Sequence, residues 1–232
     1  MVVTPSFSMP KDKKSDRFPT ARVFLPARQD LPNLRDAAET CRGCDLFEKA
    51  TQTVFGEGPE SAIMVLIGEQ PGDQEDQTGR PFVGPAGRLL DRALGEAGIS
   101  REQVYVTNAV KHFKWVARGK RRLHDKPRRS EIMACRPWLE AEISTIKPQI
   151  VVCLGGTAAQ SLMGTSFKIT QERGKVLKTE WAPLLLATIH PSALLRIIDE
   201  TERRQGFADF VADLKKAAAA LSATAPALHH PA

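Results

Sequence analysis

Three nearly unbroken apolar runs constrain the fold of this 232-residue chain more than any other feature. They cover residues 62–67, 150–154 and 184–189, and each is followed at once by glycine or histidine. A strand that is apolar on both faces is typical of a parallel sheet covered by helices on both sides. The runs therefore predict the interior strands of an α/β domain.

Segments with helical spacing alternate with these runs. In Pro85–Gly98 the apolar residues fall on one helical face, with proline at the start and glycine at the end. Further helices are predicted from about residue 32, over 130–146, after Gly155 and over 207–221, with strands over 103–110 and, less regularly, 174–179. This alternation predicts a three-layer α/β/α fold with a central, mainly parallel sheet.

The two ends of the chain differ in composition from its middle. Residues 1–30 are rich in proline and charge and are expected to form a flexible basic segment, followed by a single domain over 31–222 and a disordered tail over 223–232. No run approaches the roughly 18 apolar residues of a membrane span, and no signal peptide is recognisable. We expect a cytoplasmic protein that is monomeric and has no membrane partner.

Polar side chains follow the apolar strands at the points where the strands end. Glu69 and Gln70 follow the first run, Asn108 ends the strand over 103–110, and His190 follows the last run. Parallel strands end at the same edge of a sheet, and ligands of such folds bind there. Taken singly, each residue is also explained by ordinary turn chemistry.

The segment Arg118–Arg129 holds seven lysines or arginines against one aspartate, a net charge of +6 that equals that of the whole chain. Clustered charge creates a local field that attracts a polyanion. The segment also contains His124. It is either a solvated phosphate-binding loop with an incidental histidine, or part of a reactive site.

Four cysteines, Cys41, Cys44, Cys135 and Cys153, suit a metal or cluster site better than disulfides in a reducing compartment. Cys41 and Cys44 form a CxxC turn, but no second CxxC exists, which favours a [4Fe–4S] cluster over zinc. Alternatively, Cys135 and Cys153 are small buried hydrophobic residues. The spacing leaves both interpretations open.

The motifs resemble those of the family 4 uracil-DNA glycosylases over about residues 35–220. They are the loop 68–72 (GEQPG), the loop 79–87 (GRPFVGPAG), the His190-Pro191-Ser192 turn and the cysteine set. Gln70, where ordinary members have alanine, and the inserted segment 120–124 (KRRLH) resemble the UdgX group, whose members become covalently attached to uracil-containing DNA. The resemblance implies that all four cysteines ligate a [4Fe–4S] cluster.

The resemblance also implies roles for the residues at the strand ends. Glu69 and His190 would act in breaking the glycosidic bond, which builds positive charge on the sugar and negative charge on the departing base. Uracil would be bound by Gln70, Gly72, Phe82, Asn108 and His190. Single- or double-stranded DNA would be held by Lys120, Arg121, Arg122, Lys126, Arg128 and Ser192.

His124 separates the alternative mechanisms. An imidazole on a basic loop can capture the sugar cation at C1′ in place of water, and the resulting adduct persists because an alkylated imidazole leaves poorly. The leading hypothesis is therefore a single-turnover uracil-DNA glycosylase that becomes bonded to DNA through His124. The alternatives are an ordinary turnover enzyme of family 4 and a non-catalytic iron–sulfur protein that binds nucleic acid.

Overall fold

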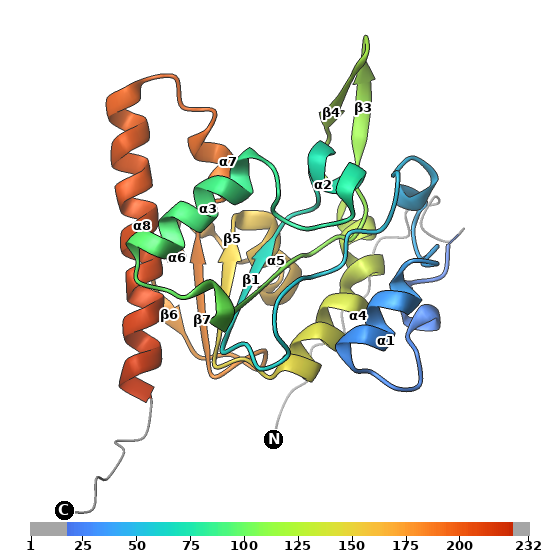
Figure 1. The fold of residues 1–232 in the computed structure, drawn as a ribbon, viewed down its shortest axis with the longest axis horizontal. Helices are drawn as coiled ribbons and strands as arrows, with labels where there is room; N and C mark the ends of the chain where they lie inside the picture. The colour runs from blue at the N-terminus through green and yellow to red at the C-terminus, as the bar shows by residue number, and fades with distance from the viewer. Residues whose placement is uncertain (1–17, 225–232) are drawn as a thin grey trace, which may run out of the picture.

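The computed structural model describes residues 18–224 and has a five-stranded sheet at its centre (Figure 1). The strand order is β2-β1-β5-β7-β6, and all neighbours are parallel except β6 and β7. The strands are β1 (Met64–Gly68), β2 (Val104–Asn108), β5 (Ile150–Leu154), β6 (Val176–Leu177) and β7 (Leu184–Thr188). β1, β2, β5 and β7 are buried along their whole length, which confirms the prediction of a covered, mainly parallel sheet.

Helices cover both faces of the sheet, so the predicted three-layer α/β/α fold is confirmed. On one face α3 (Pro85–Glu96) and α8 (Glu200–Thr224) pack over an apolar core that includes Leu90 and Phe210. On the other face α4 (Arg129–Ile146) and α5 (Gly156–Met163) pack over a second apolar core, to which α4 contributes Leu139. Shorter helices are α1 (Leu31–Ala38), α2 (Asp73–Thr78), α6 (Ile169–Glu172) and α7 (Pro191–Leu194), with 3₁₀ turns η2 (Ala21–Phe24), η3 (Asp45–Glu48) and η4 (Arg101–Gln103).

The packed domain begins earlier than the predicted boundary at residue 31. The side chain of Ala21, in η2, is 0% exposed and belongs to the cluster that also contains Cys41 and Trp138. Small apolar residues inside a charged segment carry little periodicity, which is why composition alone suggested a flexible segment. At the other end, α8 continues through residues 223 and 224. The expectations for residues 1–17 and 225–232 lie outside the described residues.

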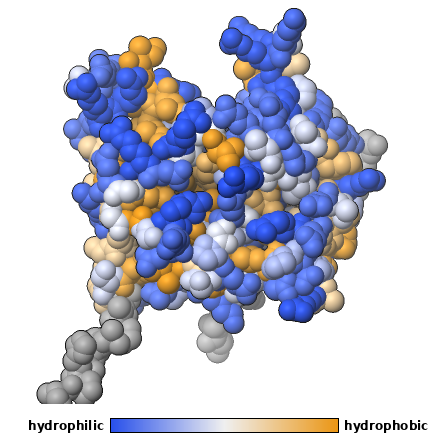
Figure 2. Space-filling view, in the orientation of Figure 1, coloured by the Kyte–Doolittle hydropathy of each residue, from blue (hydrophilic) through white to orange (hydrophobic). Residues whose placement is uncertain are grey.

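The basic segment is not the loop that its composition suggested. Residues 115–124 form an antiparallel hairpin of β3 (Trp115–Arg118) and β4 (Arg121–His124), which projects from the carboxyl edge of the sheet as a hydrophilic lobe (Figures 1 and 2). Gly119 at the turn has a φ of 59°, the left-handed conformation that tight hairpin turns require. Apolar and aromatic side chains in both strands favour this pairing despite the charge.

No helix within residues 18–224 combines the length and the apolar character needed to cross a membrane.

Candidate functional site

A cavity of about 670 Å³ lies at the carboxyl edge of the sheet. The loops that follow β1 and β7 and the end of β2 bring Glu69, His190 and Asn108 to its wall, and β4 adds His124. Gly72, the N-cap of α2, and Phe82 also line it. The structure thus brings together all the residues predicted as catalytic and all those predicted to bind the base, Gln70 included.

Gly68, the last residue of β1, forms a floor on which three of these side chains converge. A methyl group at Gly68 would lie 2.3 Å from Asn108 Oδ1, 2.8 Å from Phe82 Cζ and 3.4 Å from His190 Nε2. Asn108 Oδ1 is buried and has no hydrogen-bond partner among the described residues. A buried acceptor without a partner is costly unless a ligand satisfies it. Asn108 is therefore placed to accept a hydrogen bond from a bound molecule.

His190 presents a hydrogen-bond donor to the same place. It caps α7, and the backbone N–H of Ser192 donates to His190 Nδ1 at 3.1 Å. Because Nδ1 accepts, the neutral ring carries its proton on Nε2, the atom nearest to Gly68. Burial lowers the pKa of His190 to about 4, and Glu69 only partly offsets this effect. The imidazole is therefore neutral at physiological pH, with an N–H directed into the cavity.

Glu69 and His124 are in contact. Glu69 Oε1 lies 3.2 Å from His124 Nε2, and the two side chains are 22% and 47% exposed. Burial raises the pKa of Glu69, but hydrogen bonds from His124 and Thr157 and the nearby imidazoles more than compensate, so the net pKa lies below the ordinary value. The site therefore holds a carboxylate beside an accessible imidazole.

Gln70 also lines the cavity, and its side-chain amide is bonded to backbone groups of the protein. Its Nε2 donates to the carbonyls of Lys114 and Asp125, and its Oε1 accepts from the backbone N–H of Lys114. These bonds use the amide to join the loop after β1 to the base of the hairpin. Alanine at this position could not make them, so Gln70 helps to hold the hairpin against this loop.

Arg122 anchors the hairpin to α2 and does not point towards solvent. Its guanidinium pairs with Asp73 and with the fully buried Asp76, at 2.6 Å in each case. It also lies 5.6 Å from the ring centres of Phe113 and Trp115. Since Arg122 and His124 are two apart on β4, they share one face of the hairpin. This anchor therefore helps to hold His124 against Glu69.

The predicted DNA-binding cations fall into two groups. Arg122 and Arg128 are paired within the protein, Arg128 with Asp45 and Glu131. By contrast, Lys120, Arg121 and Lys126 form no ion pair within residues 18–224, and nor does Arg118. Ser192 lies beside His190, with its hydroxyl 2.8 Å from Nδ1. The charge that is available to an external anion is therefore smaller than the sequence suggests and is centred on the hairpin tip.

The cysteines do not all come together. Cys41, Cys44 and Cys135 are buried in one apolar cluster between α1 and α4, whereas Cys153, on β5, is buried in a different one. Burial and, to a smaller extent, the Cys41 sulfur raise the pKa of Cys44 to about 12, but burial alone accounts for the rise at Cys153. Three of the four predicted ligands thus share a site.

The shared cysteine site has features that suit metal-bound sulfur. The indole N–H of Trp138 donates to Cys41 Sγ, and the backbone N–H of Lys111 donates to Cys135 Sγ, both at 3.2 Å. Such donors stabilise thiolates and tune clusters. Within residues 18–224, no group of three or more His, Cys, Asp or Glu side chains is arranged to hold a metal ion. Three thiols thus share one buried region that contains donors to sulfur, and the fourth, Cys153, lies outside it.

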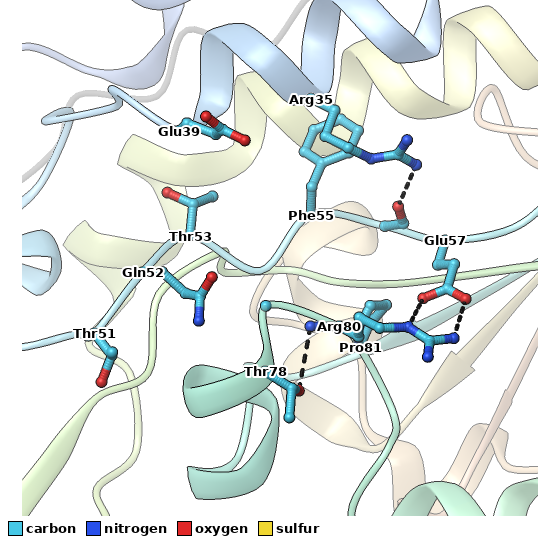
Figure 3. Close-up of a pocket in the computed structure, with 12 residues that line it drawn as sticks. Arg35, Glu39, Thr51, Gln52, Thr53, Phe55, Glu57, Thr78, Arg80 and Pro81 are labelled. Carbon is cyan, nitrogen blue, oxygen red and sulfur yellow. Dashed lines mark hydrogen bonds and ion pairs between the residues drawn. The ribbon is translucent and has the colours of Figure 1, made fainter.

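A second cavity, of about 640 Å³, lies between α1 and α2 (Figure 3). Its arginines are already engaged: Arg80 forms a two-point ion pair with Glu57, and Arg35 donates to the carbonyl of Gly56. None of the predicted site residues lines it. The predicted site residues therefore gather at the first cavity and not at this one.

Sequence reasoning missed two residues that shape the site. Thr157, at the start of α5, lines the cavity with Glu69 and helps to lower the pKa of that carboxyl. Glu75, in α2, accepts from the backbone N–H groups of Gly72 and Gly84 and so joins two loops of the cavity. For Glu75, the glycines immediately before α2 and α3 were the available signal, since exposed backbone N–H groups at a helix start require an acceptor.

Comparison with known proteins agrees with this geometry. Residues 55–215 match the model of the uracil DNA glycosylase superfamily. The chain is 36% identical over 191 residues to the type-4 uracil-DNA glycosylase of Thermotoga maritima, covering 78% of this chain and 96% of that protein. It is 39% identical over 163 residues to the type-4 enzyme of Archaeoglobus fulgidus, covering 67% and 78%. The chain therefore belongs to the uracil DNA glycosylase superfamily and is a homologue of its type-4 members.

Proposed function

We propose that this protein excises uracil from DNA and then becomes bonded to the abasic deoxyribose through His124. The observation that carries the proposal is the 3.2 Å contact between His124 and Glu69 in the cavity that also holds Asn108 and His190. Membership of the superfamily supports the excision step. The accessible imidazole beside a carboxylate supports the second step, which corresponds to the UdgX-like behaviour expected from the sequence.

Base selection follows from the two buried polar groups above Gly68. Asn108 Oδ1 would accept from N3–H of uracil, while His190 Nε2–H would donate to O2. Cytosine has no proton on N3 and would leave Asn108 Oδ1 unsatisfied. A site built on hydrogen bonds rejects such an analogue strongly, because its own buried groups lose their partners. The uracil must be turned out of the base stack to reach this cavity.

Bond cleavage moves the electron pair of the C1′–N1 bond onto uracil and leaves a cation on the sugar. The N–H of His190 stabilises the charge that develops on O2, and the ionised Glu69 stabilises the sugar cation. A ring nitrogen of His124 then forms a bond to C1′, and the ring proton passes to Glu69. The product is a neutral alkylated imidazole, which is a poor leaving group without strong acid. Each protein molecule therefore reacts once.

A denaturing gel with a uracil-containing oligonucleotide tests the proposal. A protein–DNA band that survives SDS and heat is the expected result, and a matched oligonucleotide with thymine in place of uracil should give none. Abasic product without the band would show an ordinary turnover glycosylase. Neither product nor band would show that the protein only binds nucleic acid.

Replacing Arg121 should affect DNA binding, whereas replacing its neighbour Arg122 should affect the rate of the reaction. In Arg121→Ala the dependence of log affinity on log salt should fall by about 0.9 on duplex DNA or 0.7 on single strands, the value for one lost phosphate contact. In Arg122→Ala this dependence should hold, but the rate of adduct formation at saturating DNA should fall by about tenfold or more, because misplacing a reacting group is costly. An equal loss of salt dependence in both variants would show that Arg122 contacts phosphate.

We further propose that Cys41, Cys44 and Cys135 hold a [4Fe–4S] cluster, and that Cys153 contributes nothing to it. Such a cluster would stabilise the packing of α1 against α4. Cys135→Ala should then lose iron, acid-labile sulfide and the brown colour. Cys153→Ala is the matched control because it also replaces a buried cysteine with alanine, and it should retain all three. Loss of iron from a folded Cys153→Ala protein would show that Cys153 is also a ligand of the cluster.

A further inference from the structure

A buried ion pair lies behind the base-binding cavity, and the proposed reaction does not use its charges. Lys111, from the segment after β2, is 1% exposed, and Glu142, from α4, is 0% exposed; their Nζ and Oε2 atoms are 2.5 Å apart. Replacing such a pair by apolar residues is often neutral or stabilising in other proteins. Stability alone therefore does not explain why this ion pair is present. The alternative is that the pair holds a neighbouring part of the chain in position.

The pair fixes the end of β2 through a fully connected network. Besides Glu142, Lys111 Nζ donates to Thr107 Oγ1 at 2.6 Å and to the backbone carbonyl of Asn108 at 2.9 Å, so all three of its protons are used. Glu142 also accepts from Tyr105 and Thr107, two side chains of the same strand. Networks without an unsatisfied member hold a single arrangement.

The network reaches the cavity through Asn108. Its carbonyl is held by Lys111, while its side chain places the unpartnered Oδ1 above Gly68. The next backbone N–H groups, of Ala109 and Val110, donate to the carbonyls of Gly68 and Glu69. A four-residue segment, 108–111, therefore ties the base-reading amide to the floor of the cavity and to the Glu69 loop.

We infer that Lys111 is a positioning residue for base recognition: it holds Asn108 Oδ1 where a flipped uracil presents N3–H. This inference rests on the proposed function and extends it to a residue outside the cavity. Lys111 touches no substrate in this scheme and acts through Asn108. Its removal should therefore affect the rate on uracil more than the affinity for DNA.

The test compares Lys111→Met with Tyr105→Phe under single-turnover conditions. Lys111→Met should lower the maximal rate of uracil release by about 10- to 100-fold, the scale of a small misplacement at a reacting centre. Its affinity for a uracil-free oligonucleotide should stay at the wild-type value. Tyr105→Phe removes one hydrogen bond to the same carboxylate but leaves the Asn108 carbonyl held, so its rate should stay within about twofold.

If the unpaired carboxylate of Glu142 prevents Lys111→Met from folding, the double variant Lys111→Met/Glu142→Gln takes its place. It removes the uncompensated charge of Glu142 and still lacks the hydrogen bond from Lys111 to the Asn108 carbonyl. A slow double variant of wild-type thermal stability supports the inference. A wild-type rate in either folded variant, or an equal loss in Tyr105→Phe, overturns it. If the wild-type protein releases no uracil, the proposed function itself is wrong. Failure of the proposed function is therefore distinguishable from failure of the inference about Lys111.

Discussion

Replacing His124 with alanine should abolish the heat-stable protein–DNA adduct, to below about 1% of the wild-type yield, because no other nucleophile takes its place in the scheme. Uracil should still be released, since Asn108 and His190 keep their positions and Glu69 remains to stabilise the sugar cation. Water would then capture C1′. The variant should turn over as an ordinary glycosylase, which denaturing gels and a uracil-release assay would detect together.

Leu123→Ala is the matched control for this change. Leu123 is the neighbouring residue on β4 and is exposed, and its side chain points to the opposite face of the hairpin. Its adduct yield should equal that of the wild type. Peptide mapping of the wild-type adduct should place the added sugar mass on the peptide that contains residue 124. An adduct that persists in His124→Ala would assign the bond to another residue.

The central sheet was predictable because its strands are apolar on both faces, and few other structures tolerate such runs. The hairpin was not, because seven cations over residues 118–129 concealed the short β pattern of Val116 and Leu123. The hairpin is tied to the rest of the domain by the ion pairs of Arg122 with Asp73 and Asp76, which lie nearly fifty residues away in the sequence. Contacts of this kind depend on the tertiary fold and leave no local periodicity.

The same distinction applies to the site. Glu69, Asn108 and His190 could be placed together from sequence, because parallel strands end at a common edge. The roles of Gln70 and Cys153 could not be judged in this way. The side-chain amide of Gln70 forms hydrogen bonds with backbone groups at the base of the hairpin. Cys153 is buried in a core separate from that of the other cysteines. Residue type and order suggested functions that only the direction of each side chain could test.

Gly68→Ala should nearly eliminate uracil release, because the added methyl group would occupy the floor of the base pocket. The nearest atoms, Asn108 Oδ1 at 2.3 Å and Phe82 Cζ at 2.8 Å, are closer than side-chain contacts allow, so one or both must move. A displacement on the order of 1 Å at a reacting centre costs about 100-fold in rate. We therefore expect at least this loss in single-turnover release of uracil, with DNA affinity and iron content at wild-type levels.

Gly95→Ala makes the same chemical change where there is room for it. Gly95 lies in α3, and a methyl group there would have no neighbour within 4 Å. Alanine in a helix interior is favoured over glycine by roughly 0.5–1 kcal/mol, so this variant should be slightly more stable and fully active. If Gly68→Ala were as active as Gly95→Ala, the surface above Gly68 would not be where the base lies. The three groups that converge on Gly68 would then need a different explanation, since a pocket that tolerates a methyl group on its floor cannot select a base by close contact.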